Sequence, residues 1–339
     1  MADGLRREPS INDVARAAGV SAQTVSRVAT GKDVVRPETR ERVIGAMQRL
    51  GYRPNGAARA LKSGRYQSIG VIMFSLSSYG NMRTLEAIAT EATSGGYSLT
   101  LIPLDAATQA SVSGAFARLS EQAVDGIVII IEAHILNESE IELPSGLPVV
   151  VVDSSAEYDQ PVVDTDQAQG ARLATKHLLD LGHPTVWHVA GPDESFSAQR
   201  RRESWRQTLE AGGASVPEVF VGDWSAESGQ AAGEWLLTQA GVSAVFAAND
   251  QMALGVLHAL HAAGTDVPGE ISVVGFDDMP EAASFWPSLT TVRQHFDAVG
   301  LAAVRSLIAS IEGSVPEASL LIPTELITRQ STAVFASRE

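Results

Sequence analysis

The sequence predicts an α/β fold: an N-terminal all-α helix-turn-helix head-piece, followed by a two-lobed core of parallel sheets flanked by helices. Two observations predict this division. Residues 1–65 hold 13 Lys and Arg against 6 Asp and Glu, whereas the other 274 residues hold 12 against 34. From Gln67 onward, apolar strand-like runs alternate with helix-like stretches, which is the pattern of parallel sheets covered by helices. Basic charge therefore gathers where a DNA-reading module needs it.

Composition narrows the class of protein. Of 339 residues, 45% are hydrophobic, 19% are charged and none is cysteine, so we expect packed domains without disulfides. Residues 1–9 are polar and no apolar run approaches the length of a membrane span, so we expect a cytoplasmic protein with no membrane partner. The motifs of P-loops, nucleophile elbows and dinucleotide sites do not occur, and we expect no enzyme, cofactor or metal.

Helix-capping signals organise the basic segment. Ser10 and Asp13 have the spacing of a capping box, and Gly19 suits the left-handed residue that ends a helix. Pro37 suits a first helical turn. The expected helices are 11–18, 22–29 and a third that ends at Gly51. Two short helices joined by a tight turn that contains glycine form a helix-turn-helix.

The second of these helices is the expected DNA reader. Glutamine can pair with adenine, arginine with guanine, and alanine can touch a thymine methyl group. The alternative is that these are solvated polar positions on an amphipathic helix, but the caps, the turn and the charge balance favour DNA reading. The expected contacts are Ser21, Ala22, Gln23, Ser26 and Arg27.

Four segments of the head-piece, 13–21, 24–28, 36–43 and 50–55, follow one another almost without a gap. In this order they resemble the head-piece of the lac repressor and galactose repressor family of bacterial transcription regulators. The resemblance implies that the partner is double-stranded, near-palindromic operator DNA. It also implies a homodimer that presents one reading helix to each half-site.

The linker continues the resemblance, which implies a hinge helix that forms on operator binding. A helix this short is marginal alone, and Gly56 costs about 1 kcal/mol relative to alanine, so we expect it to fold only on DNA. The resemblance implies that Leu61 is a minor-groove wedge. With it, the implied DNA contacts of the linker are Asn55, Ala58, Leu61 and Lys62. A plain flexible linker is the alternative.

The core alternates strands and helices. The expected strands are 68–74, 98–103, 126–131, 148–152, 185–190, 244–247 and 271–275, and the expected helices are 82–95, 110–122, 168–181, 198–211, 226–237, 251–263 and 296–312. Polar residues follow several of these strands, among them Asp153, Asn249 and Asp277. Because ligands bind beyond the carboxyl ends of parallel strands, we expect a small-molecule cleft there. Carboxylate, amide and guanidinium groups beside an aromatic face suit a sugar.

Core segments 222–226, 248–255, 271–278 and 289–294 are similar to the same family, and the similarity extends to about residue 330. It implies a core like that of periplasmic binding proteins, closest to the galactoside-responsive branch. The implied effector contacts are Asp153, Arg201, Trp224, Asn249, Asp277 and Phe296, with the indole of Trp224 stacked on the sugar ring.

Several alternatives stay open at these positions. Trp224 could be a core aromatic, and Arg201 could form a structural salt bridge or be displaced by one position within its run of three arginines. Asp277 and Asp278 could be plain strand-end acids or a metal pair. Segments 129–132 and 74–80 depart from the family pattern, which leaves the identity of the sugar open. In some members of the family that the chain resembles, a leucine-repeat tail makes tetramers. The sequence shows no such repeat after Gln330, so we expect a dimer.

The resulting expectation is a transcriptional regulator, most simply a repressor, controlled by a small sugar such as a galactoside. The expected domains are 1–54 for DNA binding, 55–66 as a hinge, 67–165 with 296–323 as one core subdomain, and 166–295 with 324–339 as the other. A sugar-binding transport protein, a sugar-modifying enzyme and a regulator that responds to a non-sugar effector are the alternatives.

Overall fold

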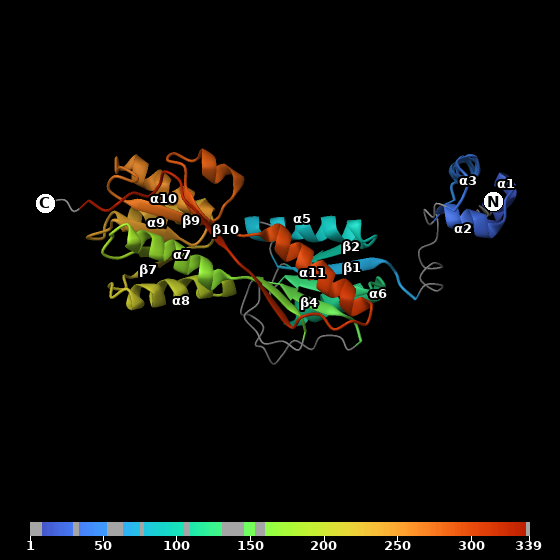
Figure 1. The fold of residues 1–339 in the computed structure, drawn as a ribbon, viewed down its shortest axis with the longest axis horizontal. Coiled ribbons are helices and arrows are strands. Elements are labelled where there is room, and N and C mark those ends of the chain that lie inside the picture. The colour runs from blue at the N-terminus through green and yellow to red at the C-terminus, as the bar shows by residue number, and fades with distance from the viewer. Residues whose placement is uncertain are drawn as a thin grey trace, which may run out of the picture. The chain divides into compact units, whose positions relative to one another are not determined.

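The computed structural model describes residues 9–29, 34–52, 64–74, 78–104, 109–130, 146–152 and 160–336. The chain divides into two compact units, Met1–Tyr66 and Gln67–Glu339. Figure 1 shows the first unit as a small group of helices and the second as two sheets with helices packed on them. The predicted α/β class with an all-α head-piece is confirmed.

The first unit consists of α1 (Ile11–Ala18), α2 (Ala22–Ala29) and α3 (Pro37–Leu50). The predicted capping box is present: Ser10 N donates to Asp13 Oδ2 at 2.9 Å, and Asp13 N donates to Ser10 Oγ at 3.4 Å. Gly19 ends α1 with φ 64°, a conformation that costs glycine no steric strain. Val14, Val25 and Val43 are fully buried and bring the three helices together.

The first lobe of the core unit is built on an all-parallel sheet. Its strands, in spatial order, are β11 (Ser319–Ile322), β5 (Val162–Thr165), β4 (Val149–Val152), β3 (Gly126–Ile130), β1 (Ser68–Met73) and β2 (Ser98–Pro103). Its helices are α5 (Tyr79–Ser94), α6 (Gln109–Glu121) and α11 (Phe296–Ile311). Two apolar clusters lie against this sheet, one with α6 and the other with α5 and α11.

The second lobe repeats this architecture, except that its edge strand β12 runs antiparallel to β10. Its strands, in spatial order, are β12 (Glu325–Ile327), β10 (Thr290–Arg293), β9 (Ser272–Asp277), β8 (Ala244–Ala247), β6 (Trp187–Ala190) and β7 (Val219–Val221). Its helices are α7 (Gln167–Asp180), α8 (Phe196–Ala211), α9 (Ala226–Leu236) and α10 (Asp250–Ala262), followed by the short 3-10 helix η1 (Pro280–Ser284). One apolar cluster includes α9 and α10, and another includes α7 and α8.

Three short crossovers join the lobes: residue 166 between β5 and α7, residues 294–295 between β10 and α11, and residues 323–324 between β11 and β12. The first and third lie side by side, because Asp166 N donates to Ile322 O at 2.8 Å. After β12 the chain stays on the second lobe, where Val273 N donates to Ser331 O at 2.8 Å. Each lobe is therefore assembled from separate stretches of the chain.

The predicted core helices are all present, and α5 begins three residues earlier than predicted. The strands β5, β7, β10, β11 and β12 were not predicted. They are three or four residues long, and β5 and β10 carry buried polar residues that break an apolar run. The prediction also ended β9 too early: the strand runs to Asp277, so this residue closes the strand rather than following it.

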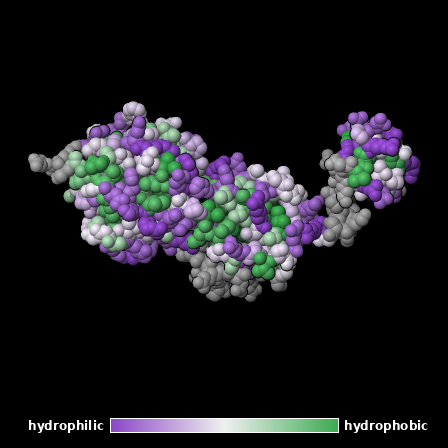
Figure 2. Space-filling view, viewed as in Figure 1, coloured by the Kyte–Doolittle hydropathy of each residue, from purple (hydrophilic) through white to green (hydrophobic). Residues whose placement is uncertain are grey.

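The visible face of the core unit mixes hydrophilic residues with hydrophobic patches (Figure 2). Within the ranges that the structure describes, no helix is both long enough and apolar enough to cross a membrane.

Helices α9 and α10 pack with their backbones in direct contact, which requires glycine on both. A Cβ on Gly229 would lie 2.2 Å from Met252 O, and a Cβ on Gly255 would lie 2.0 Å from Ala226 O. Neither distance is compatible with van der Waals radii, and the obstacle in both cases is backbone. A side chain at either position must therefore push the two helices apart.

Gly255→Ala should destabilise the core by about 1–3 kcal/mol or more, because the added methyl group overpacks this contact. The measurement is urea unfolding followed by circular dichroism. The matched control is Gly114→Ala in α6, where an added Cβ meets nothing within 4 Å. That change should stabilise by about 0.5–1 kcal/mol, since alanine favours a helix interior over glycine. Equal effects of the two changes would contradict the packing argument.

Candidate functional site

A cavity lies between the two lobes, beyond the carboxyl ends of several strands. The structure brings five of the six predicted effector contacts to its wall: Arg201, Trp224, Asn249, Asp277 and Phe296. The sixth, Asp153, lies outside the described residues. The cavity has further lining residues that the sequence analysis did not predict. Among them are the polar residues Asp164, Gln167, Ser197 and Gln294.

Arg201 is the buried cation of this cavity, with only 4% of its surface exposed. Its Nε donates to Gln167 Oε1 at 2.8 Å, and its Nη1 donates to the carbonyl oxygen of Ala248. Its guanidinium carbon lies 3.8 Å from the ring centroid of Phe276 and 5.5 Å from that of Trp224. Stacking on aromatic faces stabilises a desolvated guanidinium.

The three adjacent arginines lie in different surroundings. Arg200 pairs with Asp164, and Arg202 pairs with Asp193 at an exposed position at 3.0 Å. Only the middle residue, Arg201, lines the cavity. Both neighbours of Arg201 thus form the salt bridges of this arginine run, with Asp164 and Asp193.

The indole of Trp224 is wedged beside the backbone of the second lobe. A Cβ on Gly191 would lie 2.3 Å from its ring, so glycine at this position makes room for the indole. Trp224 adopts φ 72°, which is strained for a tryptophan. Its carbonyl oxygen accepts from Asn249 Nδ2 at 3.0 Å, while Asn249 Oδ1 caps α10 by accepting from Met252 N at 2.8 Å.

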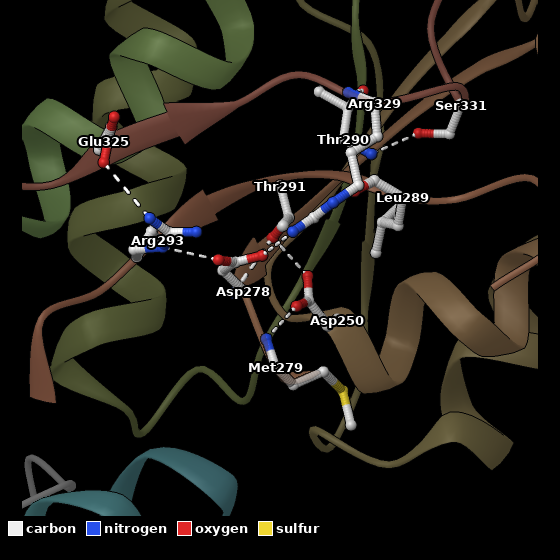
Figure 3. Close-up of polar contacts among 10 residues, drawn as sticks. All are labelled: Asp250, Asp278, Met279, Leu289, Thr290, Thr291, Arg293, Glu325, Arg329 and Ser331. Atoms are coloured by element: carbon white, nitrogen blue, oxygen red, sulfur yellow. Dashed lines mark hydrogen bonds and ion pairs between the residues drawn. The ribbon is translucent and has the colours of Figure 1, made fainter. Parts of the chain in front are cut away.

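Asp277 and Asp278 end β9 in a strained turn, with φ 115° and 52°. Asp277 faces the cavity, and its Oδ1 accepts from Gln294 Nε2 at 2.6 Å. Asp278 lies in a cluster of charged side chains with Arg293 and Arg329 (Figure 3). There it accepts from Arg293 Nε at 2.7 Å and from Arg329 Nη2 at 2.6 Å. Two arginines occupy this carboxylate, so the geometry disfavours a metal pair at 277 and 278.

Asp250, also drawn in Figure 3, forms hydrogen bonds to residues next to the strained turn. Its two carboxylate oxygens accept from Thr291 Oγ1 at 2.5 Å and from Met279 N at 2.8 Å. Burial raises the pKa of Asp250 well above its usual range, and the neighbouring charge of Asp277 adds to the rise. Asp250 is thus a buried structural acid rather than a ligand contact.

Asp164 is a buried acid on the first-lobe wall of the cavity, at 2% exposure. It accepts from Thr165 N at 2.7 Å and pairs with Arg200. Burial raises the pKa of Asp164 to about 6, although the charge of Arg200 opposes the rise. An acid inside the short apolar run of β5 was the signal in the sequence that could have identified it.

Phe296 begins α11 and forms an apolar part of the wall. Its ring meets that of Tyr79 edge-to-face, with centroids 5.8 Å apart. Gly80 lies so close that a Cβ there would come within 3.1 Å of the Phe296 ring. Burial raises the pKa of Tyr79.

In the first unit, the predicted DNA contacts of α2 lie on its accessible side. Gln23 and Arg27 are exposed, whereas Ala22 and Ser26 are partly buried. Exposed Ser21 caps the helix, because Thr24 N donates to its Oγ at 3.1 Å. The linker contacts Asn55, Ala58, Leu61 and Lys62 lie outside the described residues. Among the described residues of both units, no cluster of three or more His, Asp or Glu side chains could hold a metal ion.

Asp164→Asn should flatten the pH dependence of core stability. The raised pKa means that the folded core holds this proton more tightly than the unfolded chain, whose Asp pKa is about 3.9. The group therefore lowers stability progressively as pH rises from about 4 to about 6, by about 3 kcal/mol in total. Urea unfolding at a series of pH values measures this slope.

The control for this change is Asp297→Asn, which removes an exposed acid paired with Arg83 at the start of α11. It should leave the slope between pH 4 and 6 as in the unmodified protein. If Asp164→Asn also left the slope intact, the buried acid would not be its source.

Comparison with known proteins agrees with both parts of the chain. The family described as "Bacterial regulatory proteins, lacI family" matches residues 10–55, and a "Periplasmic binding protein-like domain" matches residues 175–332. The chain is 34% identical to the lactose operon repressor of Klebsiella pneumoniae, over 98% of this chain and 95% of the relative.

Solved structures are similar over nearly the same length. A lac repressor dimer bound to operator and the anti-inducer ONPF superposes with a TM-score of 0.84 at 32% identity, covering 96% of this chain and all of the other. A complex of the transcriptional regulator CelR with cellobiose superposes with a TM-score of 0.71 at 30% identity, covering 95% and 99%. The chain therefore belongs to the lacI family of bacterial regulatory proteins: it is a DNA-binding transcriptional regulator with a ligand-binding core, and not an enzyme.

Proposed function

We propose that this regulator is a repressor that binds a near-palindromic operator as a homodimer and is controlled by a small sugar in the cavity of its core. The observation that carries the proposal is the convergence of an indole, a guanidinium, an amide and a carboxylate on one cavity, from Trp224, Arg201, Asn249 and Asp277. Such a set can stack on a sugar ring and bind its hydroxyl groups.

Charge and symmetry support the DNA-binding part of the proposal. The basic head-piece contrasts with an acidic remainder of the chain, and α2 exposes Gln23 and Arg27, which suit bases in the major groove. A similar structure is a dimer bound to operator. Twofold symmetry in a dimer requires two half-sites of related sequence.

Membership of the family does not fix which class of sugar the protein binds. We propose a galactoside, because the segment from Gly222 to Ala226, which contains Trp224, is similar to the galactoside-responsive branch. A glucoside is the second candidate, favoured by the cellobiose complex of a similar regulator.

The deciding experiment measures binding of the purified protein to DNA from its own upstream region by fluorescence anisotropy. Lactose, other galactosides, cellobiose, phosphorylated sugars and purines are then added separately. Specific binding released by a galactoside supports the proposal. Release by cellobiose alone indicates that the effector is a glucoside. Release by purines only, or by none of these compounds, contradicts a sugar effector.

Arg27→Ala should weaken operator binding by about tenfold to a hundredfold and relax the preference at one base pair, because a bidentate contact to guanine is lost. Anisotropy on a set of single-base operator variants measures this. Arg16→Ala is the matched control, since Arg16 is also an exposed arginine but lies on α1. Equal losses on operator and unrelated DNA for both variants would contradict direct base reading by Arg27.

Trp224→Ala should weaken binding of the effector sugar by about tenfold or more, because the stacking face is lost. Operator binding without sugar should stay unchanged. Gly191→Ala tests the same contact independently, since its methyl group would displace the indole without removing it. Normal release of the operator by sugar in both variants would exclude Trp224 from the effector site.

A further inference from the structure

A continuous hydrogen-bond chain runs along the wall of the cavity. Arg201 Nε donates to Gln167 Oε1 at 2.8 Å, Gln167 Nε2 donates to Gln294 Oε1 at 3.1 Å, and Gln294 Nε2 donates to Asp277 Oδ1 at 2.6 Å. We name these four residues the glutamine relay. Each is at least nine-tenths buried and lines the cavity.

The ends of the relay fix the orientation of both amides. A guanidinium has only donors, and a carboxylate has only acceptors. Gln167 must therefore turn its oxygen toward Arg201, and Gln294 must turn its nitrogen toward Asp277. The central bond then forms only in the direction observed, from the Gln167 nitrogen to the Gln294 oxygen. Rotating either amide by a half-turn would break two bonds in a buried site, which is costly.

The relay also joins two crossovers between the lobes. Gln167 directly follows the first crossover, and Gln294 lies within the second. The third crossover is tied to the same helix turn, because Gln169 Oε1 accepts from Thr324 N at 2.7 Å and from Thr324 Oγ1 at 3.0 Å. The residues that hold Arg201 and Asp277 thus belong to the segments that connect the two lobes.

We propose that Gln167 and Gln294 are positioning residues of the cavity, which hold Arg201 and Asp277 in place and couple them to the crossovers. This rests on the proposed function in one respect, namely that Arg201 and Asp277 meet the effector. A ligand hydroxyl that binds Arg201 or Asp277 either replaces or adds to the hydrogen bond that this residue makes with Gln167 or Gln294. Occupancy of the cavity is thereby linked to the geometry of the crossovers.

The test exploits the fixed direction of the relay and needs no ligand. In Gln167→Glu, the new carboxylate still accepts from Arg201 but cannot donate to Gln294. If Gln294 rotates to compensate, its oxygen faces the Asp277 carboxylate. We expect the folded-to-unfolded ratio of the full-length protein to fall by about tenfold or more in urea unfolding. Asp277→Asn alone should change it little, because Gln294 can still donate to the oxygen of the new amide.

The double variant Gln167→Glu/Asp277→Asn should recover most of the lost stability. With Gln294 rotated, its nitrogen donates to the new carboxylate at position 167 and its oxygen accepts from the new amide at position 277, so all three bonds form again. Gln167 and Asp277 share no hydrogen bond, but two buried carboxylates at these positions would also repel each other. A recovery that is lost when Gln294→Met is added therefore passes through Gln294, whereas a recovery that persists reports only relief of this repulsion and overturns the relay. Gln167→Met should instead lose stability that Asp277→Asn does not recover, since methionine neither donates nor accepts in the relay.

The matched control is Gln169→Glu on the same turn of α7. Its oxygen only accepts from Thr324, so a carboxylate keeps both bonds. Combined with Asp277→Asn, its effect on stability should be additive. Recovery in the Gln167→Glu pair with additivity in the Gln169→Glu pair supports the relay. Additivity in both pairs overturns it.

The outcome for the relay is separate from that for the proposed function. Titrating the unmodified protein with lactose and with cellobiose tests the sugar effector. Failure of both sugars to bind would refute the proposed effector class, while the stability cycle would still decide whether the relay exists.

Discussion

A desolvated guanidinium sets the geometry of the core cavity. Arg201 loses nearly all contact with water, so its charge must be compensated by neighbours, or the cost would be several kcal/mol. Part of the compensation comes from an amide on α7, a carbonyl oxygen after β8 and two aromatic faces. Each of these groups comes from a different element, and the second lobe has to bring them together for the cation to be tolerated.

The backbone around the cavity is also strained, and contacts from other elements offset the cost of this strain. Trp224, Asp277 and Asp278 all adopt positive φ, at a cost of order 1–3 kcal/mol each. Hydrogen bonds from side chains on other elements offset this cost, notably the two arginines that bind Asp278 (Figure 3). Strain held in this way fixes the direction in which the Trp224 indole and the Asp277 carboxylate face the cavity.

The helices were predicted well from the sequence, because helix caps and apolar periodicity depend on residues that are close together in the chain. The capping box at Ser10 and the glycine after α1 are examples. Short strands were missed, since β5 and β10 become strands only by pairing with distant neighbours. The family resemblance identified five residues that line the cavity, but it did not identify Gln167 and Gln294, which line it as well. Glutamine carries no local signal, and its role here is defined only by partners far away in the sequence.

The three crossovers also have a consequence for how the chain folds during synthesis. The sheet of the first lobe lacks β11, and that of the second lacks β12, until residues beyond 318 have emerged from the ribosome. Neither lobe can therefore be completed as an early, independent domain, and both must wait with exposed apolar strand edges for the last part of the chain. The head-piece, in contrast, is one continuous segment that forms its own compact unit, so its fold does not have to wait for the last strands of the core.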